Sequence, residues 1–466
     1  MADAADSKSA ARECVRVRVP LPAPIGEVSE WSMVQPWKGC VGATPPGVRI
    51  PPSPPLKMMK FIIYLTCALM LFSANAGSKD VKLVVPGAPV RCWGGVEAIK
   101  KLKTNIKFYE EVLPVDGISF GIGPSNPFCG RRHRVTENDK EKVKAWRALM
   151  KETKHYKYNF AMCLIDQDIP KWFDDEYWDI VVYNFRVLAK MAKKAGFVGI
   201  LFDPEGYGDW PVIHPWSSVG MVKGFPRLKD KPRYPGDPKR TPEDYLKIAF
   251  KRGQQVGEGV FKEFPECNFF AYYWWSFCGW PIKNRDGNMV QGDLCAQFAY
   301  GVLDVAPPTA KVTDGDEWTG YMASGENAYK RMMDRRKTAC GTLKRKGNQK
   351  FSTKYMKNSG YAVAFYQDTY LPKPELTGSD YDKAAREQCQ RFRDNLLNAR
   401  RTASDFIWLY GEKYSWWPDT PKDYEQKIKR GETPRKTWYD AIPGLTKPMF
   451  GSKFKEFHYK KAENEK

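Results

Sequence analysis

The fold is decided by residues 177–206, which read YWDIVVYNFRVLAKMAKKAGFVGILFDPEG. The first part carries apolar side chains at positions 180, 181, 188, 191, 192 and 195, the spacing of an amphipathic helix. Gly196 stands where a helix ends on a left-handed residue, and the apolar run Phe197–Phe202 then predicts a buried strand. The stretch is therefore one helix and strand of a repeating α/β arrangement.

Seven further apolar runs along the chain predict the remaining strands. They are Val90–Trp93, Gly117–Gly121, Asn159–Ile165, Phe269–Trp275, Val302–Ala306, Ala362–Tyr366 and Phe406–Tyr410. Amphipathic patterns between them predict helices over Glu137–Thr153, Tyr177–Ala195, Pro242–Phe264, Asn327–Thr338 and Tyr381–Ala403. Eight such units favour an α/β protein of the (β/α)8 TIM-type barrel class, with long loops after strands 4 and 5 at residues 206–240 and 276–292. The alternative is an open doubly wound sheet, but no glycine-rich phosphate-binding motif follows any strand.

The composition describes a globular, strongly basic chain. Its 466 residues carry a net charge of +21 and are 14% aromatic, which excludes a mainly disordered or collagen-like protein. Such a surface attracts anions. The four histidines show no zinc-binding spacing, so we expect no metal and no cofactor. Basic stretches at 329–350 and 453–461 are interpreted first as solvated faces, and otherwise as surfaces that attract an anionic glycan.

An apolar run near the N-terminus predicts export. Residues 61–72 read FIIYLTCALMLF, with Lys57 and Lys60 before them and Ala74-Asn75-Ala76 after them, as in a cleaved signal peptide. The run is too short to span a bilayer comfortably, so we expect no stable membrane insertion after cleavage behind Ala76. An uncleaved signal anchor is the alternative. A cleaved signal peptide predicts a secreted or periplasmic protein.

Four segments follow from these patterns. Residues 1–57 are Pro-rich without apolar periodicity and are interpreted as a non-native or disordered extension, with the true start at Met58 or Met59. Residues 58–76 form the signal peptide, 77–418 the catalytic-type barrel, and 419–466 a basic tail that packs on the barrel. Export and the lack of a zinc-knuckle, RRM or basic-zipper pattern argue against a nucleic-acid partner.

Carboxylates stand at the ends of several predicted strands. Asp203 and Glu205 are two residues apart at the end of the fourth, so both point to the same side, into the barrel mouth. Asp368 ends the seventh and Glu412 the eighth. Asp166, Asp168 and Asp304 also follow predicted strands, although each is more typical of a helix cap. Paired acids without histidine suit glycoside cleavage, in which one acid protonates the leaving oxygen and another attacks or stabilises the sugar cation.

Aromatic side chains crowd the same strand ends and loops. Sugar rings stack their apolar faces on such side chains, so we predict that these residues bind substrate. The candidates are Tyr207, Trp210, Trp275, Trp280, Tyr366, Trp408, Tyr410 and Trp416. Half of the run Tyr272–Trp275 is expected to be core, because alternate strand residues face the helices.

The pattern Gly199-x-x-x-Asp203-x-Glu205 resembles the second half of the D-x-x-D-x-D-x-E signature of chitinase-like (β/α)8 glycoside hydrolases. The resemblance implies that Glu205 donates the proton and that Asp203 orients a substrate N-acetyl group. Val198 and Leu201 stand where the first two aspartates of the signature would be. The chain is also similar to retaining barrel glycosidases, which implies Glu205 as acid/base and Asp368 as nucleophile, although Pro204 replaces their usual asparagine.

These observations favour a secreted glycoside hydrolase that acts on a polysaccharide or oligosaccharide. Its partner would be a carbohydrate substrate, including an anionic glycan. Two alternatives remain open: a non-catalytic glycan-binding barrel, and a lyase on acidic polysaccharide that uses Tyr366 as base.

Overall fold

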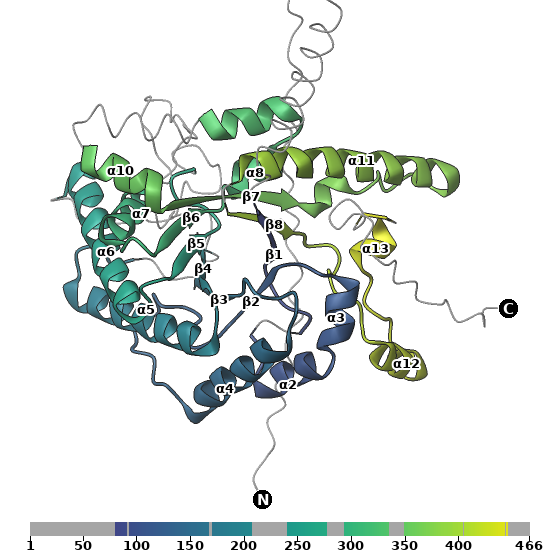
Figure 1. Ribbon diagram of the computed structural model, residues 1–466, viewed down its shortest axis with the longest axis horizontal. Helices are drawn as coiled ribbons and strands as arrows, with labels where there is room; N and C mark the ends of the chain where they lie inside the picture. The colour runs from purple at the N-terminus through teal and green to yellow at the C-terminus, as the bar shows by residue number, and fades with distance from the viewer. Residues whose placement is uncertain are drawn as a thin grey trace, which may run out of the picture. The chain divides into compact units, whose positions relative to one another are not determined.

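In the computed structural model, eight parallel strands close into a barrel with helices around it (Figure 1). The structure describes residues 80–90, 93–166, 170–206, 240–276, 293–334, 349–403, 405–442 and 444–445. Each strand pairs with its neighbours in chain order, and β1 pairs with β8. The strands are β1 Lys82–Val85, β2 Gly117–Phe120, β3 Phe160–Asp166, β4 Gly199–Gly206, β5 Asn268–Ala271, β6 Lys311–Asp314, β7 Ser359–Tyr366 and β8 Phe406–Tyr410. The predicted TIM-type barrel is confirmed.

Helices connect successive strands on the outside of the barrel, as parallel neighbours require. Many begin on a polar cap: Thr136, for example, forms a capping box with Asp139 at the start of α4. The helices are α2 Val96–Thr104, α3 Ile106–Val112, α4 Glu137–Glu152, α5 Asp175–Ala195, α6 Pro242–Glu263, α7 Asp293–Val305, α8 Glu317–Met322, α10 Gln349–Asn358, η3 Gln367–Tyr370, α11 Gly378–Thr402, α12 Pro421–Lys429 and α13 Trp438–Ala441. Residues 326–334 are also helical. Residues 207–241 connect β4 to α6 and residues 272–292 connect β5 to α7, which are the two long connections expected.

Two predicted strands were placed wrongly. The first strand is Lys82–Val85, whose last three residues are buried, and not Val90–Trp93. The predicted sixth strand, Val302–Ala306, lies at the end of α7, and the true β6 is Lys311–Asp314. Leu294, Phe298 and Val302 of α7 are all fully buried, and a short apolar run of this kind does not distinguish a buried helix from a strand.

Aromatic residues fill the barrel in layers. Phe160, Phe270 and Phe406 meet with ring centroids 5.3–5.7 Å apart. Two residues further along β8, Trp408 stacks on Tyr272 at 4.6 Å. Strand alternation then brings Tyr410 to the carboxyl end of the barrel. The interior is therefore a packed core, and parallel barrels build their sites at the carboxyl end above it.

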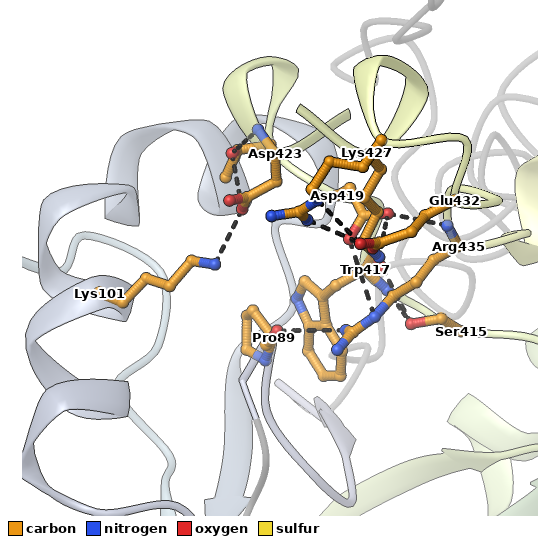
Figure 2. Close-up of polar contacts among 11 residues, drawn as sticks. Pro89, Lys101, Ser415, Trp417, Asp419, Asp423, Lys427, Glu432 and Arg435 are labelled. Carbon is orange, nitrogen blue, oxygen red and sulfur yellow. Dashed lines mark hydrogen bonds and ion pairs between the residues drawn. The ribbon is translucent and has the colours of Figure 1, made fainter. Parts of the chain in front are cut away.

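The segment after β8 is fastened to the first βα units by polar contacts. Figure 2 shows Asp419 between Lys427, whose ammonium donates to both carboxylate oxygens at 2.9 and 3.1 Å, and Arg435, whose backbone N–H donates at 2.8 Å. A guanidinium nitrogen of Arg435 reaches the Pro89 carbonyl in the loop after β1. Asp419 is only 8% exposed, so it is a desolvated charge that depends on these partners.

Replacing Asp419 with alanine is therefore expected to lower the free energy of unfolding by about 2 kcal/mol, because it leaves Lys427 and the Arg435 N–H without their acceptor. Chemical denaturation of the variant measures this loss. Lys101→Ala is the matched control: it removes an exposed ion pair with Asp423 nearby and is expected to cost under about 0.5 kcal/mol. Equal losses in the two variants would contradict a special role for Asp419.

Among the described residues, no helix combines the length and apolar character needed to cross a membrane.

Candidate active site

The end of β4 contributes two acids to the barrel mouth. Asp203 is buried at 3% exposure, and its Oδ1 accepts the backbone N–H of Glu205 at 2.9 Å. Glu205 is half-buried. This hydrogen bond ties the Asp203 side chain to the backbone at the end of β4, where the pairing register with β3 shifts.

A second group of acids follows β6, on the turn from Asp314 to Glu317. The Gly315 N–H donates to the Ala271 carbonyl at 2.8 Å, and the Glu317 N–H donates to the Tyr272 carbonyl at 3.1 Å. The indole of Trp408 donates to the Gly315 carbonyl at 2.9 Å. The end of β5 and the centre of β8 thus hold the turn that carries Glu317 into the mouth.

Glu317 faces the two acids of β4. It is 9% exposed, and burial raises its pKa well above the ordinary value of a glutamate. The negative charges of Glu205 and Asp203 raise the pKa further, while Tyr321, which lies beside the carboxyl group, opposes the shift. Glu317 therefore keeps its proton at a pH where an exposed glutamate is ionised.

Asp314, at the end of β6, is a second buried acid whose pKa is raised. Burial and the neighbouring charge of Asp316 raise its pKa to about 7. Its oxygens accept the N–H and the hydroxyl of Ser276, both at 2.6 Å, and the N–H of Asp316 at 2.9 Å. Asp314 holds loop backbone in place, so we assign it to the framework of the site.

Tyrosines line the space around these acids. Burial raises the pKa of Tyr272, Tyr273 and Tyr321, and the nearby carboxylates raise it further. Tyr410 lies in the electrostatic field of Glu412, Glu317, Glu205 and Asp203 alike, and its ring stacks with that of Tyr321 at 6.4 Å. All four phenols stay neutral and can donate hydrogen bonds.

The other two predicted acids form a separate group. Asp368 lies in η3, after β7, and its Oδ1 accepts the backbone N–H of Glu412 at 3.1 Å. Tyr366 lies beside Glu412, and its ring stacks with that of Tyr410 at 6.2 Å. Asp368 thus ties the loop after β7 to the loop after β8, whereas the carboxylates that act on Glu317 are Glu205 and Asp203.

The predicted tryptophans have different surroundings. Trp408 is fully buried within the barrel, and Trp275 packs against Tyr300 and Tyr355 of the helical layer. Trp416 stacks on Trp438 of α13. All three are at most 8% exposed, so their rings offer little surface on which a sugar could stack. Tyr207, Trp210 and Trp280, and also Asp168, lie outside the described residues.

Sequence reasoning missed Glu317 because it placed the sixth strand in α7. Asp304, assigned to that strand end, lies on α7 and accepts a hydrogen bond from Gln254. A signal was present: Lys311-Val-Thr-Asp314-Gly-Asp316-Glu317 ends in three acids and a glycine, much as β4 ends in Asp203-Pro-Glu205-Gly206. Repetition of such an ending marks a second barrel strand that carries site residues.

No set of three or more metal-ligating side chains with suitable geometry occurs among the described residues. No protein-family model matches the chain, and no curated protein matches it. The fold and the geometry of the acids therefore carry the functional argument.

Proposed function

We propose that the protein is an exported glycoside hydrolase in which Glu317 and Glu205 form the catalytic pair. The observation that carries the proposal is the convergence of a buried glutamate from α8, whose pKa is raised by burial and by the charges of Glu205 and Asp203, with a half-buried glutamate from β4. Glycosidases separate the roles of two carboxyl groups by such differences in environment. The barrel fold supports the proposal because it is common among glycoside hydrolases, although the fold alone does not imply the activity.

The roles follow from the two environments. The Glu317 proton passes to the glycosidic oxygen as the bond to the anomeric carbon breaks, and the electron pair of that bond goes to the oxygen. Water then forms the new bond to the anomeric carbon and gives up a proton to the Glu317 carboxylate. Glu205, which is nearer to solvent, is assigned to face the positive charge that develops on the sugar. Asp203 holds the Glu205 backbone and adds negative charge beside Glu317. This proposal moves the proton-donor role from Glu205, as the sequence resemblance implied, to Glu317.

The substrate is proposed to be an oligosaccharide or polysaccharide. Tyr321, Tyr366 and Tyr410 are half-buried. Tyr410 stacks with the other two rings, which are tilted against each other, and the three form an aromatic wall on the β7–β8 side of the mouth. Such a wall suits the apolar face of a sugar ring, and the phenols and carboxylates beside it suit sugar hydroxyls.

A panel of neutral, sulfated and uronate polysaccharides tests the function. The purified protein should release reducing ends from at least one of them, Glu205→Gln should release none, and Glu326→Gln should behave as the parent. Glu326 is a suitable control because it is an exposed glutamate on the next helix, residues 326–334. Sugar binding without bond cleavage by the parent would instead identify a non-catalytic glycan-binding barrel. Unsaturated products would identify a lyase.

Neutralising Asp203 should move the alkaline limb of the pH–rate profile to lower pH. The negative charge of Asp203 helps to hold the proton on Glu317, so Asp203→Asn lowers the pKa of the general acid and lets it ionise earlier. Steady-state rates from pH 4 to 9 measure the limb. An unchanged alkaline limb would show that another group supplies the proton.

A further inference from the structure

The turn that presents Glu317 contains an unusual backbone conformation. Asp316 has φ 42° and ψ 46°, in the left-handed region. Within the part of the chain that the structure describes, every other residue with positive φ is a glycine. Placing a side chain there is unfavourable, although less so for aspartate than for most residues.

The side chain of Asp316 does not form the hydrogen bond that is usual for an aspartate at a helix N-terminus. Asp316 is the N-cap of α8, where aspartate ordinarily accepts a helical N–H, yet its side chain makes no capping hydrogen bond. Instead, its Oδ2 accepts the hydroxyl of Tyr361, which comes from β7. Asp316 is 2% exposed, so this contact lies in the interior.

If only the left-handed backbone mattered, glycine would adopt it with less strain than aspartate. Glycine occupies every other position with positive φ in the described part of the chain. An aspartate at a position where glycine would cost less therefore points to a use for its side chain. Backbone strain of this kind concentrates at functional sites, where surrounding contacts enforce it.

The contacts around the turn show what the side chain contributes. On one side, Gly315 lies so close to β5 that an added Cβ would be 2.5 Å from the Tyr272 carbonyl oxygen. From the barrel interior, the Trp408 indole holds the Gly315 carbonyl. The bond from Tyr361 to Asp316 adds the tie to β7, next to Glu317 in sequence. Three strands thus determine the direction in which Glu317 leaves the turn.

We propose that Asp316 is a positioning residue: its left-handed backbone and its hydrogen bond with Tyr361 direct the Glu317 carboxyl group toward Glu205 and Asp203. The inference rests on the proposed function, because the purpose of this alignment is proton donation by Glu317. Asp316 acts through Glu317 and needs no contact with substrate.

Three variants test the proposal. Asp316→Gly permits the backbone conformation but removes the tie, and Tyr361→Phe removes the donor. Asp316→Asn keeps an acceptor oxygen and tolerates the left-handed region. We expect kcat to fall at least tenfold in Asp316→Gly and Tyr361→Phe, with KM within twofold of the parent. Asp316→Asn should recover most of the rate, and the Asp316→Gly/Tyr361→Phe double variant should be no slower than Asp316→Gly.

Thermal denaturation separates positioning from general damage. Asp316→Gly relieves strain as it loses the hydrogen bond, so its Tm should stay close to that of the parent while kcat falls. Parental kcat in Asp316→Gly would overturn the proposal, and so would a loss of rate that merely follows a loss of stability.

The pKa of Glu317 is a second measurement that tests the proposal, and it does not require catalytic activity. Carbon-13 NMR titration of the glutamate carboxyl groups, with the Glu317 signal assigned through Glu317→Gln, reports the pKa of Glu317 directly. If Asp316 positions Glu317, Asp316→Gly should lower that pKa by about one unit or more, since Glu317 gains solvent and moves from Glu205. An unchanged pKa overturns the positioning role. An inactive parent in which the pKa still shifts overturns only the proposed function.

Discussion

Replacing Glu317 with glutamine should lower kcat on a natural glycoside by about 10²–10⁴-fold, the usual contribution of a general acid. Glutamine has nearly the shape of the protonated glutamate but no acidic proton to transfer. Because Glu317 is buried beside Glu205 and Asp203, the neutral amide should also leave the fold as stable as the parent or more stable. Steady-state kinetics on the best substrate, with circular dichroism as the check on folding, measures both effects.

The leaving group supplies the internal control for this prediction. An aryl glycoside with an acidic phenol leaves without protonation, so Glu317→Gln should reduce its bond cleavage far less than that of an alkyl glycoside. Glu205→Gln should reduce both substrates similarly, because the negative charge facing the sugar is needed in each case. Equal losses for both leaving groups in Glu317→Gln would assign Glu317 a role other than proton donation.

Raising the pH from 5 to 8 should destabilise the protein by on the order of a few kcal/mol. The pKa of Asp314 is about 7 in the folded chain against an ordinary value of 3.8, so in this window the folded state holds a proton that the unfolded state has lost. Stability from this group is complete below the unfolded pKa and disappears as the pH passes the folded pKa. Glu317 acts in the same direction.

Urea denaturation at several pH values measures this slope. Asp314→Asn should flatten it, even though the amide disturbs the bonds from Ser276 and lowers the overall stability. Asp139→Asn is the contrast: Thr136 and His133 lower the pKa of Asp139, so its contribution is lost only at acid pH. A slope that is the same in the parent and in Asp314→Asn would contradict the assignment.

The barrel could be predicted because most of its strands and helices carry strong local patterns. The strand at Phe406–Tyr410 was predicted with its observed bounds, and the helix ending at Ala195 with its C-terminal end and glycine cap. The sixth strand could not. Strand β6 reads Lys311-Val312-Thr313-Asp314, and Val312 is its one aliphatic residue. This segment is a strand because it pairs with β5 and β7, and those partners lie far from it in the sequence.

The sequence pattern located Asp203 and Glu205 at the end of a barrel strand, as β4 has them, but it did not predict the register shift of the β3–β4 pairing at these residues. The approach of Glu317 to them depends on the left-handed Asp316 and on contacts from β5, β7 and β8. A local pattern records neither the turn geometry nor contacts made across 45 residues or more of sequence.

Helix α12 contributes no buried residue, and its Ile428 is 54% exposed. It adjoins the rest of the protein through charged groups such as Lys427 and Asp423, and the tyrosine wall and the acids of the mouth are built without it. Changes of length or composition along this helix are therefore expected to leave the acids of the mouth in place. A reporter or an additional binding module could be inserted here with little effect on the stability of the barrel, provided that the contacts of Asp419 with Lys427 and Arg435 are kept.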